Sequence, residues 1–140
     1  MVSITATYDG DLRCTATHGP SGSTLTTDAP LDNQGKGEAF SPTDLCATAL
    51  ITCIATTMAI KARSMGIELG KMEMSVEKHM SLKNPRRIAR LPVEIKIGDI
   101  LDEKQKTRLE RVAHACPVHH SLHPDIEMPI TITWGDESPE

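Results

Sequence analysis

The sequence predicts a single mixed domain in which strands precede and follow a buried helix. Three observations predict it: segments in which apolar and polar residues alternate, one long segment without charge, and only three aromatic residues in 140. Alternation with a period of two is typical of strands, whereas a helix that is apolar all round is buried in protein. With so few aromatic residues, we expect a core of aliphatic side chains and methionine. The length is that of one domain.

The N-terminal segment is predicted to form strands joined by turns. Residues 2–8 and 12–16 alternate, and Asp9-Gly10 between them favours a hairpin turn. A third short strand is expected over residues 23–27. Residues 28–39 are rich in Gly, Asp, Asn and Lys and predict a mobile loop, whose length is typical of functional loops.

The strongest local signal marks a long central helix. Ser41, Pro42 and Asp44 form an N-terminal capping pattern, and Gly66 supplies the C-terminal stop. Residues 45–60 carry no charge, which predicts burial on every face. Because this segment is shorter than the ~20 residues that cross a membrane, we expect no membrane partner. One chain of this size offers little cover for such a helix, so a homodimer is expected.

The pattern that follows predicts a long hairpin and, at the end of the chain, a last strand. Residues 72–80 and 88–97 both alternate, and Asn84-Pro85 provides a turn between them. Residues 130–134 again have the composition of a strand.

A second helix is predicted between the hairpin and the last strand. Asp102 and Gln105 form a capping box at its start. Apolar residues then recur at helical spacing, which places a cysteine on the buried stripe as the helix ends: Leu109, Val112, Ala113 and Cys116. Pro117 stops this helix and can open a short one through Leu122.

Charge and the N-terminal residues exclude some function classes. The net charge is −4, whereas a surface that binds nucleic acid needs a basic excess. We therefore expect no nucleic-acid partner, and interpret the basic residues 86–90 as a solvated turn and strand entry. Residues 1–5 lack the pattern of a signal peptide, so we expect a cytoplasmic protein whose cysteines are reduced at rest.

The four cysteines are candidates for redox chemistry. No C-x-x-C is present, so spacing indicates neither a thioredoxin-type motif nor a zinc ribbon. Cys46 and Cys53 are separated by roughly 10 Å along one helix, too far for a disulfide. Cys53 would need a partner elsewhere, and Cys116, at an element boundary, is the best candidate. The alternative is that all four are buried, unreactive thiols, and we favour this for Cys14 and Cys46.

Cys116 has a sequence context that predicts reactivity. It stands directly before Pro117, where a helix N-terminus would lower the pKa of the thiol. The thiolate is the reactive form of cysteine, so chemistry at sulfur is the leading hypothesis.

Two motifs connect these elements to a known family. They are Ser41-Pro42-Thr43-Asp44-Leu45 with Ala49-Leu50-Ile51-Thr52-Cys53, and Ala115-Cys116-Pro117-Val118-His119. With their context, which covers nearly the whole chain, they resemble the OsmC/Ohr family of thiol-dependent organic hydroperoxide reductases, and its divergent OsmC-like branch in particular. The resemblance implies an α+β fold in which antiparallel sheets wrap around the buried central helix. It also implies an intertwined homodimer with active sites at the interface.

The same resemblance implies the roles of the two cysteines. Cys53 would attack the O–O bond of an organic hydroperoxide and become a sulfenic acid, and Cys116 would resolve it to a disulfide. An external dithiol, in this family often a lipoyl group, would then reduce the disulfide. Neither a cofactor nor a metal is expected.

One position departs from the family. A Glu that precedes the peroxidatic cysteine by ten residues and pairs with an arginine is replaced by Thr43. Asp44 is the adjacent acid, but one residue along a helix turns the side chain by about 100°, and Asp44 already has a capping role. Arg13 is the candidate for the arginine. The resemblance therefore predicts the fold more directly than the catalytic efficiency.

Two alternatives to a peroxidase are left open. Histidines are dense near the second cysteine, and Cys116, His119 and His123 could share one face of a short helix that binds zinc or copper, with His114 and His120 nearby. Such motif matches have many false positives. The other alternative is a non-enzymatic small-ligand-binding or stress-related module with structural cysteines, for which the missing Glu is the best support.

Overall fold

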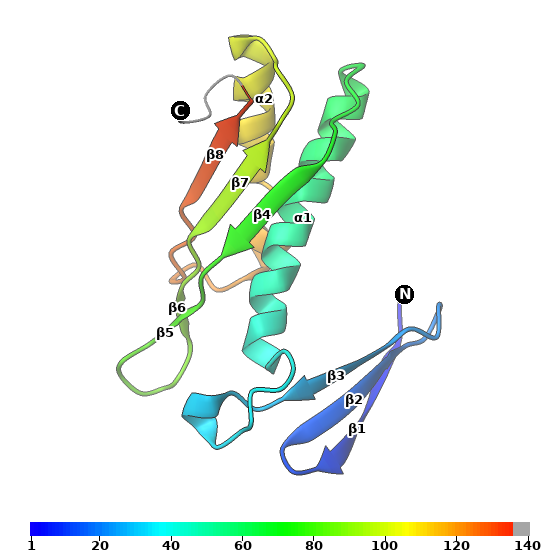
Figure 1. Cartoon of the computed structure of the whole chain (residues 1–140), viewed down its shortest axis with the longest axis vertical. Helices are drawn as coiled ribbons and strands as arrows, with labels where there is room; N and C mark the ends of the chain where they lie inside the picture. Colours follow the sequence, from blue (N-terminus) through cyan, green and yellow to red (C-terminus); the bar gives the residue numbers. More distant parts are fainter. Residues whose placement is uncertain (136–140) are drawn as a thin grey trace. The chain divides into compact units, whose positions relative to one another are not determined.

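The computed structural model describes residues 1–135. It divides into two compact units, Met1–Cys46 and Ala47–Glu140. The strands and helices follow in this order (Figure 1): β1 Ile4–Gly10, β2 Arg13–His18, β3 Thr24–Asp28, a 3-10 helix Leu31–Asn33, α1 Pro42–Ser64, β4 Met72–Val76, β5 His79–Met80, β6 Ile88–Arg90, β7 Val93–Ile97, α2 Glu103–Ala113, α3 Pro117–Ser121 and β8 Ile130–Trp134.

The first unit contains an antiparallel sheet in the order β1-β2-β3. The predicted hairpin is present, but its turn lies at Asp11 and Leu12, which both have positive φ, and not at Asp9-Gly10. Asp9 lies at an irregularity in the pairing of β1 with β2, and its carboxylate accepts hydrogen bonds from the hydroxyls of Thr7 and Thr15, at 2.9 and 2.6 Å.

The sheet of the first unit has little core of its own. Asp28 is the one residue of its three strands that is buried, while apolar residues such as Ile4 and Tyr8 are 65% and 66% exposed. A three-stranded sheet needs one covered apolar face for stability. One chain therefore leaves this sheet without a buried face.

Both predicted ends of α1 are confirmed. The Ser41 N–H donates to the Asp44 carboxylate at 2.9 Å, and the Asp44 N–H donates to the Ser41 hydroxyl at 3.1 Å, so a capping box begins the helix. At the other end Gly66 has φ +75°, and the Ile67 N–H donates to the Ala62 carbonyl at 2.9 Å. This is a Schellman ending, in which glycine takes the left-handed position.

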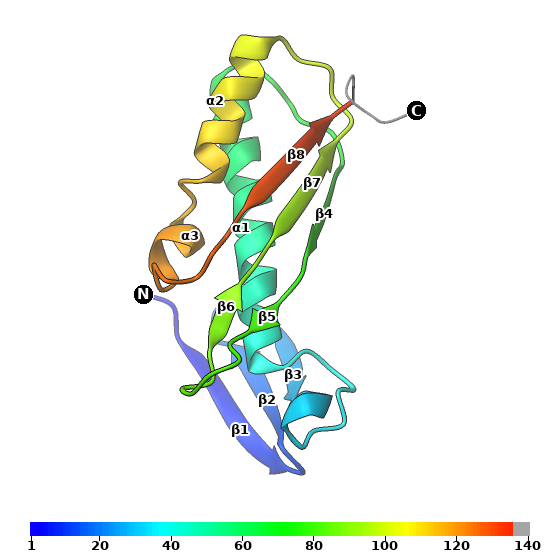
Figure 2. The ribbon, with the colours of Figure 1, turned by 90° about the vertical axis from the view of Figure 1, so that its left-hand side faces the viewer.

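Burial of α1 on every face, however, is not seen within one chain. One side is buried, and the residues that form it are Ala47, Leu50, Ile54, Ala55, Met58 and Ala62. Thr52, Thr56 and Ile60 are exposed, and Ile60 by 68%. The physical reason is that the sheet and helices of the second unit lie along one side of the helix only (Figures 1 and 2).

The length of α1 also differs from the prediction. The helix has 23 residues, and by length and composition it could cross a membrane, which corrects the argument from residues 45–60 alone. Core helices of soluble proteins have the same length and composition, and the buried side of α1 packs within the second unit.

The second unit contains a mixed sheet in the order β4-β7-β8. The predicted hairpin is confirmed but interrupted, because β4 pairs with β7 and, closer to the turn, β5 pairs with β6. The antiparallel pairing that was expected is present between these strands, whereas β8 runs parallel to β7. The reason is topological: α2 connects these two strands as a crossover, which is how parallel neighbours are joined.

One face of this sheet forms the core. Residues of β7 alternate between buried and exposed, and Val93, Ile95 and Ile97 point inward. Both α1 and α2 lie on the same side of the sheet (Figures 1 and 2). At the end of β8, Trp134 is buried, and its indole N–H donates to the Glu110 carboxylate of α2 at 2.9 Å. The sheet thereby holds α2, after which Cys116 follows.

Candidate functional site

Cys53 lies on α1 in the second unit. Its side chain is half-buried, and its Sγ lies 3.9 Å from the Thr57 hydroxyl, one helical turn further on. The helix fixes the sulfur because the capping box at Ser41 and the Schellman ending at Gly66 hold both ends of α1.

Cys116 lies at the start of α3 and is fully buried. The predicted second helix begins with the Asp102 and Gln105 capping box but ends at Ala113, so Cys116 follows that helix and is not part of it. Pro117 is the first residue of α3, as predicted. The Cys116 sulfur accepts the His119 N–H, with 3.3 Å between the two atoms.

The structure brings Cys53 and Cys116 together. Both are free thiols, and the Cys53 side chain lies near enough to Cys116 to raise the pKa of the Cys116 thiol. Cys14 on β2 and Cys46 near the start of α1 belong to the first unit. They are half-buried, so the expectation of fully buried thiols holds only in part for them.

The environment of Cys116 changes its expected chemistry. Burial raises the pKa of the Cys116 thiol, the His119 N–H lowers it, and the neighbouring Cys53 side chain raises it further. The balance is a raised pKa, which contradicts the lowering expected from a helix N-terminus. Burial disfavours the thiolate, and α3, with five residues, offers little compensation. Cys116 is therefore a protonated thiol that can donate its hydrogen to the Cys53 sulfur.

The histidines near Cys116 pack against each other. The ring of His119 lies edge-on to the rings of His114 and His120, with centroids 6.3 Å apart in each pair. Burial lowers the pKa of His119, and the neighbouring His114 and His120 add to the effect, so His119 is neutral at pH 7.

The arrangement that a metal site would need is not present in residues 1–135. They hold no group of three or more His, Cys, Asp and Glu side chains arranged around a common point. His123 turns to its own loop instead, where its Nδ1 accepts the Asp125 N–H at 3.1 Å.

The three auxiliary candidates lie in the first unit. Arg13 forms ion pairs with Asp28, at 3.5 Å, and with Glu38. Thr43 Oγ1 lies 3.2 Å from the Ser41 hydroxyl, and Asp44 caps α1 as described. The carboxylates that pair with Arg13 are therefore those of Asp28 and Glu38. The family pattern had instead indicated position 43, or the adjacent Asp44, as the place of the acid.

The Arg13 cluster is held together by one buried acid. Asp28 is 1% exposed and lies opposite Arg13 in the pairing of β2 with β3. Its Oδ2 accepts the Glu38 N–H at 2.9 Å. This N–H lowers the pKa of Asp28, burial opposes the shift, and the charge of Arg13 lowers the pKa again. Sequence reasoning missed Asp28 and Glu38 because both fell in the segment interpreted as a mobile loop.

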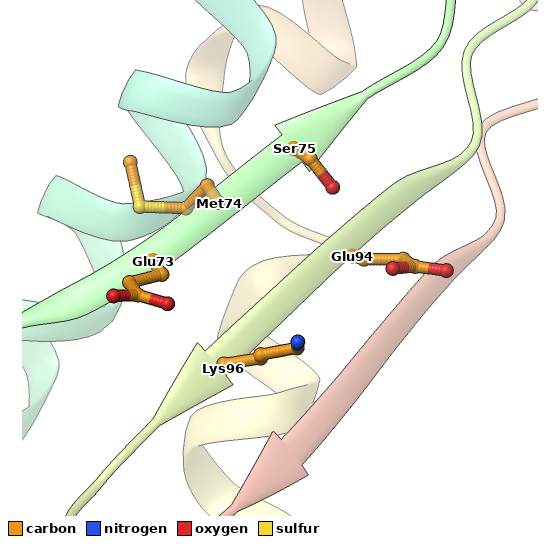
Figure 3. Close-up of a pocket in the computed structure, with 5 residues that line it drawn as sticks. All are labelled: Glu73, Met74, Ser75, Glu94 and Lys96. Carbon is orange, nitrogen blue, oxygen red and sulfur yellow. The ribbon is translucent and has the colours of Figure 1, made fainter.

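A shallow pocket lies on the other face of the second sheet. About 230 Å³ in volume, it is lined by Glu73, Ser75, Glu94 and Lys96, while Met74 points back toward α1 (Figure 3). It contains neither cysteine nor histidine, so the thiol pair is the better candidate for chemistry.

Fold and site together define an α+β protein with a pair of adjacent free thiols. The family model of OsmC-like proteins matches residues 35–131, more than half of the chain. The chain therefore belongs to the OsmC family, and the resemblance inferred from the two motifs is confirmed.

Solved structures give the same fold over nearly the whole chain. A protein of Psychrobacter arcticus 273-4, provisionally described as osmotic stress induced and as a detoxification response protein, is 44% identical, with a TM-score of 0.89 over 95% of this chain and 96% of that one. The organic hydroperoxide resistance protein OsmC of Legionella pneumophila is 16% identical, with a TM-score of 0.76 and coverage of 95% and 96%. OhrB of Bacillus subtilis is 17% identical, with a TM-score of 0.71 and coverage of 95% and 98%. No curated protein sequence matches the chain.

Proposed function

We propose that this protein reduces organic hydroperoxides through a disulfide between Cys53 and Cys116. The observation that carries the proposal is the contact between the two thiols, of which Cys116 stays protonated. A nucleophilic cysteine needs its thiolate, and a resolving cysteine needs only to reach the oxidised sulfur. The half-buried Cys53 suits the first role and the fully buried Cys116 suits the second.

The proposed reaction has three steps, which are attack by Cys53, resolution by Cys116 and reduction by an external dithiol. The Cys53 thiolate attacks the terminal peroxide oxygen, the O–O bond breaks, and the departing alkoxide takes a proton to become an alcohol. The Cys116 thiol then attacks the sulfenic sulfur, the S–S bond forms, and its hydrogen leaves with the hydroxyl as water. An external dithiol reduces the disulfide by exchange and is itself oxidised, and a lipoyl group is a dithiol of this kind.

Family membership supports this function. The proteins of Legionella pneumophila and Bacillus subtilis carry organic hydroperoxide resistance in their names, but their low identity to this chain shows the fold alone. The more similar Psychrobacter protein is described by stress and detoxification, which agrees with a redox role.

The direct test is the mass of the reduced protein after one equivalent of an organic hydroperoxide. We expect the loss of two hydrogen atoms, and peptide mapping that joins Cys53 to Cys116. A dominant bridge from Cys53 to Cys14 or Cys46, or an unchanged mass, would contradict the proposal.

A non-enzymatic module is the second candidate. The observation that favours it is the pairing of Arg13 with Asp28 and Glu38, because neither acid stands at the position of the family's Glu, which Thr43 occupies here. An unchanged mass in the same experiment would favour this candidate.

We also propose that the protein is a homodimer. Family members are usually dimeric, and two features of one chain support the proposal. The sheet β1-β2-β3 has no covered face, and α1 exposes a side that includes Ile60. A second copy would bury these surfaces, and apolar burial is the main favourable term in such association.

Light scattering at micromolar concentration is expected to give twice the mass of one chain. Ile60→Asp should weaken the dimer by about tenfold or more, because it places a charge on the exposed side of α1. Ile100→Asp is the matched control, since Ile100 is 77% exposed and lies between β7 and α2. A fully folded monomer in the wild type would rule the dimer out.

A further inference from the structure

Three threonines surround Cys53 on α1, and two of them have satisfied hydroxyls. Thr52 Oγ1 donates to the Thr48 carbonyl at 2.8 Å, and Thr56 Oγ1 donates to the Thr52 carbonyl at 3.0 Å. Both side chains are exposed. A bond to the carbonyl four residues earlier is the ordinary arrangement for threonine within a helix.

Thr57 departs from this arrangement. Its side chain is half-buried. Within residues 1–135 its hydroxyl forms a hydrogen-bond contact with the Cys53 sulfur, at 3.9 Å. The spacing of four residues places the two side chains on the same face of the helix. The hydroxyl is thus turned from the backbone toward the sulfur.

We propose that the Thr57 hydroxyl donates a hydrogen bond to the Cys53 thiolate and so activates this cysteine for nucleophilic attack. The inference rests on the proposed function, which assigns the attack to Cys53. A hydrogen bond to an ionised acceptor is shorter and stronger than one between neutral groups, so the contact would tighten when Cys53 loses its proton.

Cys116 provides the second donor to the same sulfur. It is a titratable group near Cys53, and its raised pKa keeps its hydrogen available at neutral pH. The Cys53 thiolate would therefore accept one hydrogen bond from oxygen and one from sulfur. Both donors are uncharged. Activation of Cys53 by these two groups therefore does not need the family's Arg–Glu pair, whose Glu is replaced by Thr43.

The test measures how fast iodoacetamide alkylates Cys53 between pH 5 and pH 10. Peptide mass spectrometry follows Cys53 separately from the other cysteines. For Thr57→Val we expect the half-maximal rate at a higher pH than in the wild type, and a rate at pH 7 lower by about threefold to tenfold, because the thiolate loses one donor.

Two kinds of variant separate the hydroxyl from packing. Thr57→Ser keeps the hydroxyl and should restore the wild-type profile. Thr56→Val is the matched control on the same helix, since its hydroxyl bonds to the backbone, and it should change the rate by less than about twofold. Thr57→Ala removes the hydroxyl without branching and should behave like Thr57→Val if valine disturbs folding.

A wild-type profile for both Thr57→Val and Thr57→Ala would overturn the inference, and so would a Thr57→Ser protein as slow as Thr57→Val. Alkylation uses no hydroperoxide, so its outcome is separate from that of the proposed function. If Thr57→Val shifts the alkylation profile but the wild type forms no disulfide with hydroperoxide, the proposed reaction is contradicted. The proposed hydrogen bond between Thr57 and Cys53 is then still supported.

Discussion

Cys116→Ser is expected to stop the oxidation of Cys53 at the sulfenic acid. In the wild type the Cys116 thiol contacts the Cys53 side chain and can displace the hydroxyl from the oxidised sulfur. A serine hydroxyl at the same position forms no disulfide. The variant should therefore gain one oxygen atom with one equivalent of hydroperoxide, where the wild type loses two hydrogen atoms, and disulfide formation should disappear.

The measurement is intact-protein mass spectrometry with and without dimedone, which traps sulfenic acids. Cys53→Ser should give neither product, because it lacks the attacking thiol. Cys46→Ser is the control on the same helix and should form the disulfide like the wild type. A Cys116→Ser protein that still forms an internal disulfide through Cys53 would assign the resolving role to another cysteine.

Trp134→Ala is expected to cause the largest loss of stability among single core substitutions. The indole is 1% exposed, and its N–H donates to the Glu110 carboxylate at 2.9 Å. Removing a buried tryptophan leaves a cavity and typically lowers the free energy of unfolding by about 3–5 kcal/mol. The Glu110 carboxylate also loses its donor, which adds to the cost.

Urea denaturation followed by far-ultraviolet circular dichroism measures this loss. Trp134→Phe keeps most of the apolar volume but lacks the N–H, so its loss should lie between that of the wild type and that of Trp134→Ala. Ile100→Ala, on the surface, should change stability by less than about 0.5 kcal/mol. If Trp134→Ala cost less than about 1 kcal/mol, the contact between β8 and α2 would not support the core as described.

The two thiols differ because their surroundings differ. Cys116, which follows α2 in the chain and directly precedes α3, is buried and has a raised pKa. Cys53 is half-buried beside the Thr57 hydroxyl. Under the proposed mechanism this difference sets the order of events, since the burial that disfavours a thiolate at Cys116 leaves the first attack to Cys53.

Three helix ends were determined by the sequence itself. Ser41 and Asp44 at the start of α1, Gly66 at its end, and the Asp102 box at the start of α2 all act within a few residues of the backbone groups that they satisfy. The two cysteine motifs likewise identified the family. Such signals are local, so they can be predicted from neighbouring residues alone.

Only the tertiary structure decided how distant segments meet. It placed Cys116 against Cys53, raised the pKa of Cys116 where a helix N-terminus predicted the opposite, and paired Arg13 with Asp28 and Glu38. It also made β8 parallel to β7. Each of these depends on burial or pairing between segments far apart in the chain, and local sequence patterns do not specify which segment covers a given side chain.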